Sequence, residues 1–66
     1  MIVNKFLKEK SGQNLRAEIH SDTDGYNIKY FINETMQTQK TFAGQTIRQV
    51  EDEAKGWINS VGVING

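Results

Sequence analysis

Residues 46–61, TIRQVEDEAKGWINSV, are the most informative segment of this 66-residue chain, because their pattern indicates both a structure and where it starts. Thr46 and Gln49 fit a capping box, in which each side chain accepts a hydrogen bond from the other residue's backbone N–H. Apolar residues then recur at helical spacing and form one stripe, made of Ile47, Val50, Ala54, Trp57, Ile58 and Val61. The pattern predicts an amphipathic helix that ends near Gly62 and covers a sheet.

Two segments upstream of the helix alternate between apolar and polar residues, as half-buried strands do. Residues 15–21 direct Leu15, Ala17 and Ile19 to one side. Residues 26–33 direct Tyr26, Ile28, Tyr30 and Ile32 to one side and Asn27, Lys29, Phe31 and Asn33 to the other. Tight turns at 22–25 and 33–35 require neighbouring strands to be antiparallel.

A third strand is predicted over residues 36–42, with Met36, Thr38 and Phe42 directed inward. Lys40 shares their parity, so either the strand is bulged or Lys40 lies at an edge with its amine in solvent. Residues 2–10 are ambiguous: Val3, Phe6 and Leu7 have helical spacing, and a strand is the second reading.

The predicted fold is therefore α+β: a single domain over residues 1–66, in which a C-terminal helix packs on one face of a three-stranded antiparallel meander. The N-terminal segment adds either a short helix or a fourth strand. A chain of this length buries only about 60% of the surface that its unfolded form exposes. Stability must then come from an efficient core or from self-association, because cysteine is absent.

Composition excludes several classes of function. Eight basic residues balance eight acidic ones, so the chain lacks the positive field expected of a protein that binds nucleic acid through its phosphates. No apolar run approaches the roughly 20 residues that span a bilayer, and the N-terminus turns charged by Lys5. We therefore expect a soluble cytoplasmic protein without a membrane segment, a cofactor or a metal site. The single histidine, His20, cannot build a catalytic triad alone, and we do not expect an enzyme.

Five residues are candidates for partner binding. Phe31 and its neighbour Lys29 lie on the strand face that should contact water, which makes this face a candidate interface unless Phe6 or Leu7 covers Phe31. On the helix, Gly56 costs roughly 1 kcal/mol relative to alanine and serves no core packing. It lies opposite the apolar stripe, together with Asp52 and Ser60. We expect binding of a protein partner, with a homodimer as one form of it.

The alternative is a nucleic-acid-associated protein that uses the sheet face. Arg16, Lys29, Phe31 and Lys40 could then bind a single strand through phosphate contacts and base stacking. The neutral net charge argues against this reading.

Three segments carry a resemblance to a known group of proteins: Val3–Lys8, Phe42–Thr46, and Val50–Ala54 followed by Trp57. Together they resemble a pattern in small uncharacterised proteins of tailed phages that infect marine cyanobacteria. The resemblance implies a phage-encoded accessory protein that acts in the cytoplasm of an infected host cell. It implies no activity, and its motif is a packing motif.

Overall fold

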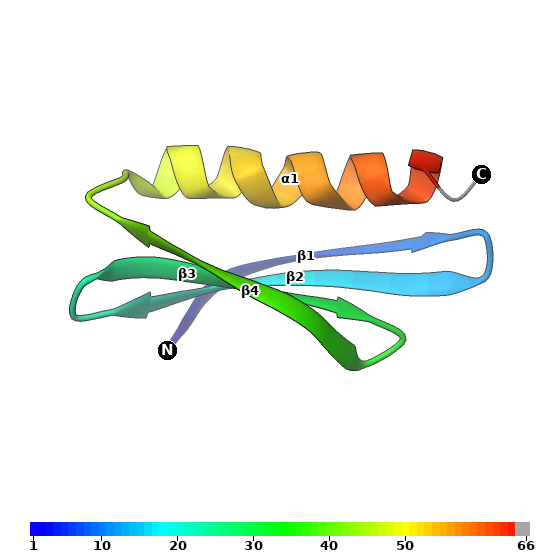
Figure 1. Cartoon of the computed structure of the whole chain (residues 1–66), viewed down its shortest axis with the longest axis horizontal. Helices are drawn as coiled ribbons and strands as arrows, with labels where there is room; N and C mark the ends of the chain where they lie inside the picture. Colours follow the sequence, from blue (N-terminus) through cyan, green and yellow to red (C-terminus); the bar gives the residue numbers. More distant parts are fainter. Residues whose placement is uncertain (65–66) are drawn as a thin grey trace.

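A computed structural model describes residues 1–64, with side chains described for residues 1–60, as a four-stranded antiparallel sheet and one helix (Figure 1). The elements are β1 (Ile2–Lys10), β2 (Gln13–Asp22), β3 (Gly25–Ile32), β4 (Thr35–Ala43) and α1 (Ile47–Ile64). The sheet order is β1-β2-β3-β4, so each strand pairs with the next one in the chain. The predicted α+β meander is confirmed, and its N-terminal segment is a fourth strand rather than a helix.

Strand β1 shows why the helical spacing of Val3, Phe6 and Leu7 was misleading. Phe6 pairs with Ala17 of β2 and packs against the core, whereas Leu7 points to the opposite face and is 66% exposed. A strand separates adjacent side chains in this way, and a helix would have kept Phe6 and Leu7 on one side. The pairing also covers an edge of β2 that would otherwise be bare.

Tight turns set the register of the meander. The β1–β2 turn has positive φ at Ser11 and Gly12, and the β3–β4 turn has positive φ at Asn33 and Glu34. Two successive positive φ values define the turn whose twist matches that of a hairpin. Gly25 begins β3 with φ 138°. The turns predicted at 22–25 and 33–35 are both confirmed.

Helix α1 starts as predicted. The Thr46 N–H donates to Gln49 Oε1 at 3.0 Å, and the Gln49 N–H donates to Thr46 Oγ1 at 3.3 Å. Its end differs, because the helix continues past Gly62 to Ile64. Glycine permits the left-handed conformation that ends a helix but does not require it. The Val61 side chain and the tail residues 65–66 lie outside the described part.

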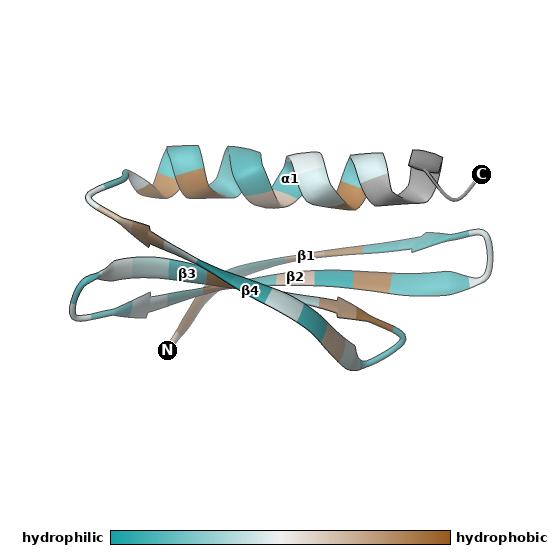
Figure 2. Ribbon diagram, viewed as in Figure 1, coloured by the Kyte–Doolittle hydropathy of each residue, from teal (hydrophilic) through white to brown (hydrophobic). Residues whose placement is uncertain are grey.

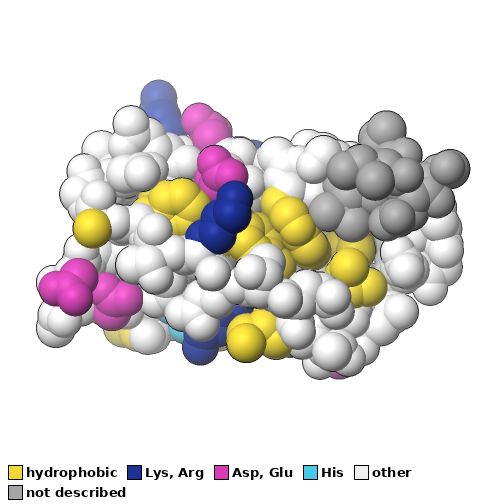
Figure 3. Space-filling model, in the orientation of Figure 1, with side chains coloured by type: hydrophobic (Ala, Val, Ile, Leu, Met, Phe, Trp, Pro, Cys, Tyr) yellow, Lys and Arg dark blue, Asp and Glu magenta, His cyan; other side chains and the backbone are white. Residues whose placement is uncertain are grey.

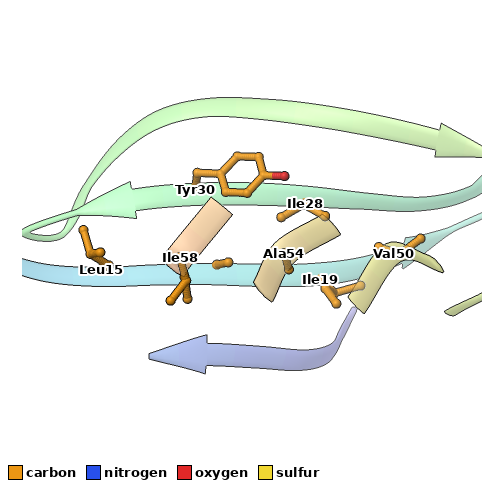
Figure 4. Close-up of a cluster of buried hydrophobic side chains, with 8 residues drawn as sticks. Leu15, Ile19, Ile28, Tyr30, Val50, Ala54 and Ile58 are labelled. Carbon is orange, nitrogen blue, oxygen red and sulfur yellow. The ribbon is translucent and has the colours of Figure 1, made fainter. Parts of the chain in front are cut away.

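The core lies between α1 and the face of the sheet that it covers, here called the inner face (Figures 2 and 4). Its fully buried members come from β2, β3 and α1: Leu15, Ala17, Ile19, Ile28, Tyr30, Val50, Ala54 and Ile58. Ile47 and Trp57 pack at the margin and are only partly buried. The predicted apolar stripe is therefore confirmed for its described members, with Val50, Ala54 and Ile58 at its centre.

Strand β4 is bulged near its start, but Lys40 fits the other of its two readings, because it lies on an edge strand with a side chain that is 56% exposed. Tyr30 pairs with Thr38, but the next residue, Phe31, pairs with Met36, so Gln37 is extra. The bulge reverses the side of every residue that precedes it. Met36, predicted to point inward, therefore lies on the other side of the sheet, the outer face. Lys40 pairs with Ile28 and stays on the inner side.

Candidate interaction surfaces

A row of paired residues crosses all four strands on the outer face of the sheet, and it is apolar on every strand except β2. Leu7 pairs with Arg16, Arg16 with Phe31, and Phe31 with Met36. We call these four residues the Leu7–Met36 row. Leu7 is 66% and Met36 51% exposed, while Phe31 is half-buried. Helix α1 packs on the inner face only, so nothing in the described part of the chain covers this row as α1 covers the core.

Arg16 shields Phe31, whereas the sequence had suggested Phe6 or Leu7 as its cover. The Arg16 guanidinium lies 4.2 Å from the centre of the Phe31 ring. It also forms ion pairs with Glu18, at 2.8 Å, and with Glu34. The hydrogen bond from Arg16 to Glu34 is the main cause of a raised Arg16 pKa. Arg16 therefore holds a fixed position in the middle of the row, against the ring of Phe31.

Lys29 lies in the next row of the outer face, beside the apolar one. That row runs Lys5, Glu18, Lys29 and Gln39 across the four strands. Glu18 lies between two lysines on neighbouring strands, so the row carries charges of both signs and one net positive charge. The predicted neighbours Phe31 and Lys29 thus share one surface, which is apolar in one row and mixed in charge in the next.

Lys40 does not belong to this surface, which contradicts the sheet-face patch of Arg16, Lys29, Phe31 and Lys40. It points to the inner side of β4, and its Nζ lies 3.4 Å from Glu53 Oε2 of α1. Lys40 keeps the inward parity of Thr38 and Phe42 that the sequence indicated, because all three residues follow the bulge. The four residues considered for nucleic-acid binding are therefore divided between two faces.

The three helix candidates Asp52, Gly56 and Ser60 lie together at a second surface. They line a hollow of about 290 Å³ between α1 and the β3–β4 side of the sheet, here called the α1–β4 hollow. The rest of its lining consists of Tyr30, Lys40, Glu53 and Trp57. Figure 3 looks onto this side, where hydrophobic side chains are visible beneath the helix, next to basic and acidic groups.

Aromatic side chains form the apolar part of this hollow. The rings of Tyr30 and Trp57 lie 4.6 Å apart, tilted by 39°. Tyr30 is 1% exposed, and its Oη has no hydrogen-bond partner among the described residues. Burial, aided by the negative charge of Glu53, raises the pKa of Tyr30 to about 12. The hydroxyl therefore stays protonated over the physiological pH range.

Gly56 lies in open space, as its position opposite the apolar stripe predicted. A Cβ added there would meet no atom of the described chain within 4 Å. Ser60 Oγ donates to the Trp57 carbonyl at 3.3 Å, and Asp52 is exposed. The five predicted site residues are thus divided between two surfaces, on opposite sides of the sheet.

Sequence reasoning missed Leu7 and Met36 on the outer face, and Tyr30 and Trp57 as lining of the hollow. Leu7 could have been found by treating residues 2–10 as a strand, because Lys5, Leu7 and Glu9 then share a side. Met36 required the position of the bulge, which no residue in 35–43 marks. Tyr30 and Trp57 look like ordinary core residues until the helix is placed on the sheet.

No family model, curated protein or solved structure matches this chain. Within its described residues, no cluster of three acidic, histidine or cysteine side chains could hold a metal ion. No described helix is long and apolar enough to cross a membrane. The two surfaces are therefore interpreted from their own chemistry.

Proposed function

We propose that this chain is a small non-enzymatic protein-binding domain that binds a partner protein on the outer face of its sheet. The observation that carries the proposal is the Leu7–Met36 row. Three apolar side chains reach across four strands on a face that no described element covers. Exposed apolar side chains gathered on one face, here Leu7 and Met36 on either side of the Arg16–Phe31 pair, are typical of protein interaction sites. Together with the resemblance to phage proteins, this suggests an accessory protein that acts on a host or phage protein in an infected cell.

The size of the face suits a specific but modest interface. Four strands spaced about 4.8 Å apart, with about nine residues rising 3.3 Å each, give a face of roughly 600 Å². Two such faces in contact would bury roughly 1,200 Å² in total, the lower end of the range for specific complexes. A second copy of this chain is a suitable first partner, because the neighbouring row of Lys5, Glu18, Lys29 and Gln39 carries charges of both signs and can pair with itself.

Contacts on the face favour a protein over a nucleic acid. Arg16 is neutralised by Glu18 and Glu34, and its guanidinium occupies one side of the Phe31 ring where a base would stack. Lys40 is on the other side of the sheet. What remains of the proposed phosphate-binding patch is Lys29, which pairs across the strands with Glu18.

Sedimentation equilibrium of the native chain and of a Leu7→Thr/Met36→Thr variant tests the proposal. Threonine removes apolar surface from the row but keeps a high preference for strands. We expect the native chain to self-associate and the double variant to be monomeric. Thr41→Ser, on the outer face but in a different row, is the matched control and should behave like the native chain.

If the native chain is monomeric, the test turns to binding of other proteins. Captures from infected-cell lysate by the native chain and by the double variant are then compared. A protein retained by the native chain and lost with the double variant supports the proposal. Equal capture by both, or salt-sensitive binding of a single-stranded oligonucleotide to the native chain alone, would contradict it.

A further inference from the structure

The α1–β4 hollow has two features that nothing else in the described chain explains. Tyr30 Oη is buried without a hydrogen-bond partner there, although buried hydroxyls are nearly always paired. Gly56 interrupts a helix at a cost of roughly 1 kcal/mol, although no neighbouring atom of the described chain requires the absence of a side chain. Both residues line the same hollow. An occupant that approaches Gly56 and reaches toward the hydroxyl would account for both.

Charge indicates what kind of occupant fits. Asp52 and Glu53 bring two carboxylates to the lining, and Lys40 brings one ammonium group. The Lys40–Glu53 pair is loose, with 3.4 Å between the charged atoms and side chains that are 56% and 46% exposed. Such a pair contributes little to stability and exchanges readily with solvent. The hollow therefore has a net negative charge, and the chain's own Lys40 neutralises only one of its two carboxylates.

The aromatic lining points to the same kind of occupant. Trp57, which is only partly buried and is backed by the Tyr30 ring, offers ring surface to a hydrocarbon stem, and an indole ring attracts cations. Lysine combines these two requirements, because a four-carbon stem packs on apolar surface while its ammonium group reaches polar partners. Lys40 already shows that an ammonium group can lie beside Glu53 in this hollow.

We propose that the α1–β4 hollow binds a primary ammonium group on an alkyl stem, presented as a lysine side chain by a partner protein. Asp52 and Glu53 accept hydrogen bonds from the ammonium group, and Tyr30 Oη, which is buried while Lys40 pairs with Glu53, becomes a further acceptor when Lys40 moves. The stem lies along Trp57 and crosses the helix where Gly56 leaves room. Lys40 competes for Glu53 and moves aside when the site is filled. The proposal does not depend on the outer face.

The test uses n-butylammonium, which reproduces the lysine stem and its charge, and n-butanol as the neutral control of equal length. Trp57 is the only tryptophan, so its fluorescence reports directly on the hollow. At low ionic strength we expect a saturable change with n-butylammonium and a change at least about tenfold weaker with n-butanol. Equal responses to both compounds, or no saturable response to n-butylammonium, would overturn the proposal.

Two variants of the loose pair make the test specific. Lys40→Met keeps the stem and removes the competing charge, so binding of n-butylammonium should tighten several-fold. Glu53→Gln keeps the shape and removes an acceptor charge, so binding should weaken by about tenfold. Unchanged affinity in both variants would show that the hollow does not recognise charge. The Leu7→Thr/Met36→Thr variant should bind n-butylammonium like the native chain, so failure of one proposal leaves the other standing.

Discussion

Two glycines, Gly25 and Gly56, have opposite effects on stability, and the atoms around each of them explain why. Gly25 has φ 138°, and a Cβ there would lie 2.6 Å from the backbone oxygen of Phe42. Gly56 has open space around its Cα and a helical conformation. We expect Gly25→Ala to destabilise the fold by about 2 kcal/mol, and Gly56→Ala to stabilise it by about 1 kcal/mol. Urea denaturation followed by Trp57 fluorescence measures both. A destabilising Gly56→Ala would mean that the glycine serves the fold rather than a partner.

Tyr30 makes the folded state less stable as the pH rises into the alkaline range. Its pKa is about 12 in the folded chain, because burial disfavours the phenolate, against an ordinary value of 10.0. The folded state therefore holds this proton more tightly than the unfolded state does. Its contribution to stability is full below pH 10 and is lost as pH rises toward 12.

Ultraviolet titration of a Tyr26→Phe variant isolates Tyr30, because the chain has two tyrosines. We expect no phenolate absorbance near pH 10 and a rise near pH 12 or on alkaline unfolding. A Tyr26→Phe/Tyr30→Phe variant provides the baseline and should lose this part of the alkaline destabilisation. Titration of Tyr30 near pH 10 in a chain that is still folded would show that the hydroxyl is accessible to water.

At the scale of elements, the local sequence pattern was enough to place a helix or a strand wherever its capping or its alternation gave a clear signal. The capping box placed the start of α1, and the alternation in β2 and β3 placed their buried apolar residues, because one face of each strand is apolar. It did not place Asn27, which is buried on the opposite face of β3. Strand β4 lacks such a contrast: Phe42 alone is half-buried and the other residues of the strand are exposed. Its register depends on the bulge, and the bulge depends on pairing with β3, which is a tertiary property.

The same reasoning explains what could be predicted of the candidate surfaces. Phe31 was identified because an aromatic residue broke a polar alternation, and Gly56 because a glycine broke a helix. Arg16 and Tyr30 violate no local rule, since an arginine suits a wet strand face and a tyrosine a core. Their roles follow from partners distant in sequence, namely Glu34 for Arg16 and the helix residue Trp57 for Tyr30.

The described residues form two layers with one small core and an outer sheet face that none of them covers, and this arrangement links stability to association. Anything that binds the folded state and not the unfolded one stabilises it by mass action. If two copies join through the outer face and separate on unfolding, each tenfold rise in concentration adds about 0.7 kcal/mol per chain. For a domain of this size, that corresponds to a rise in melting temperature of roughly 3–5 °C.

Melting curves of the native chain over a hundredfold concentration range measure this link. We expect the melting temperature to rise with concentration in the native chain and to stay constant in the Leu7→Thr/Met36→Thr variant. Thr41→Ser should follow the native chain, which separates loss of the apolar row from a general effect of changing the outer face. A melting temperature that is independent of concentration in all three would exclude a second copy as the partner. The apolar row would then be expected to bind a different protein, whose addition should raise the melting temperature of the native chain and not that of the double variant.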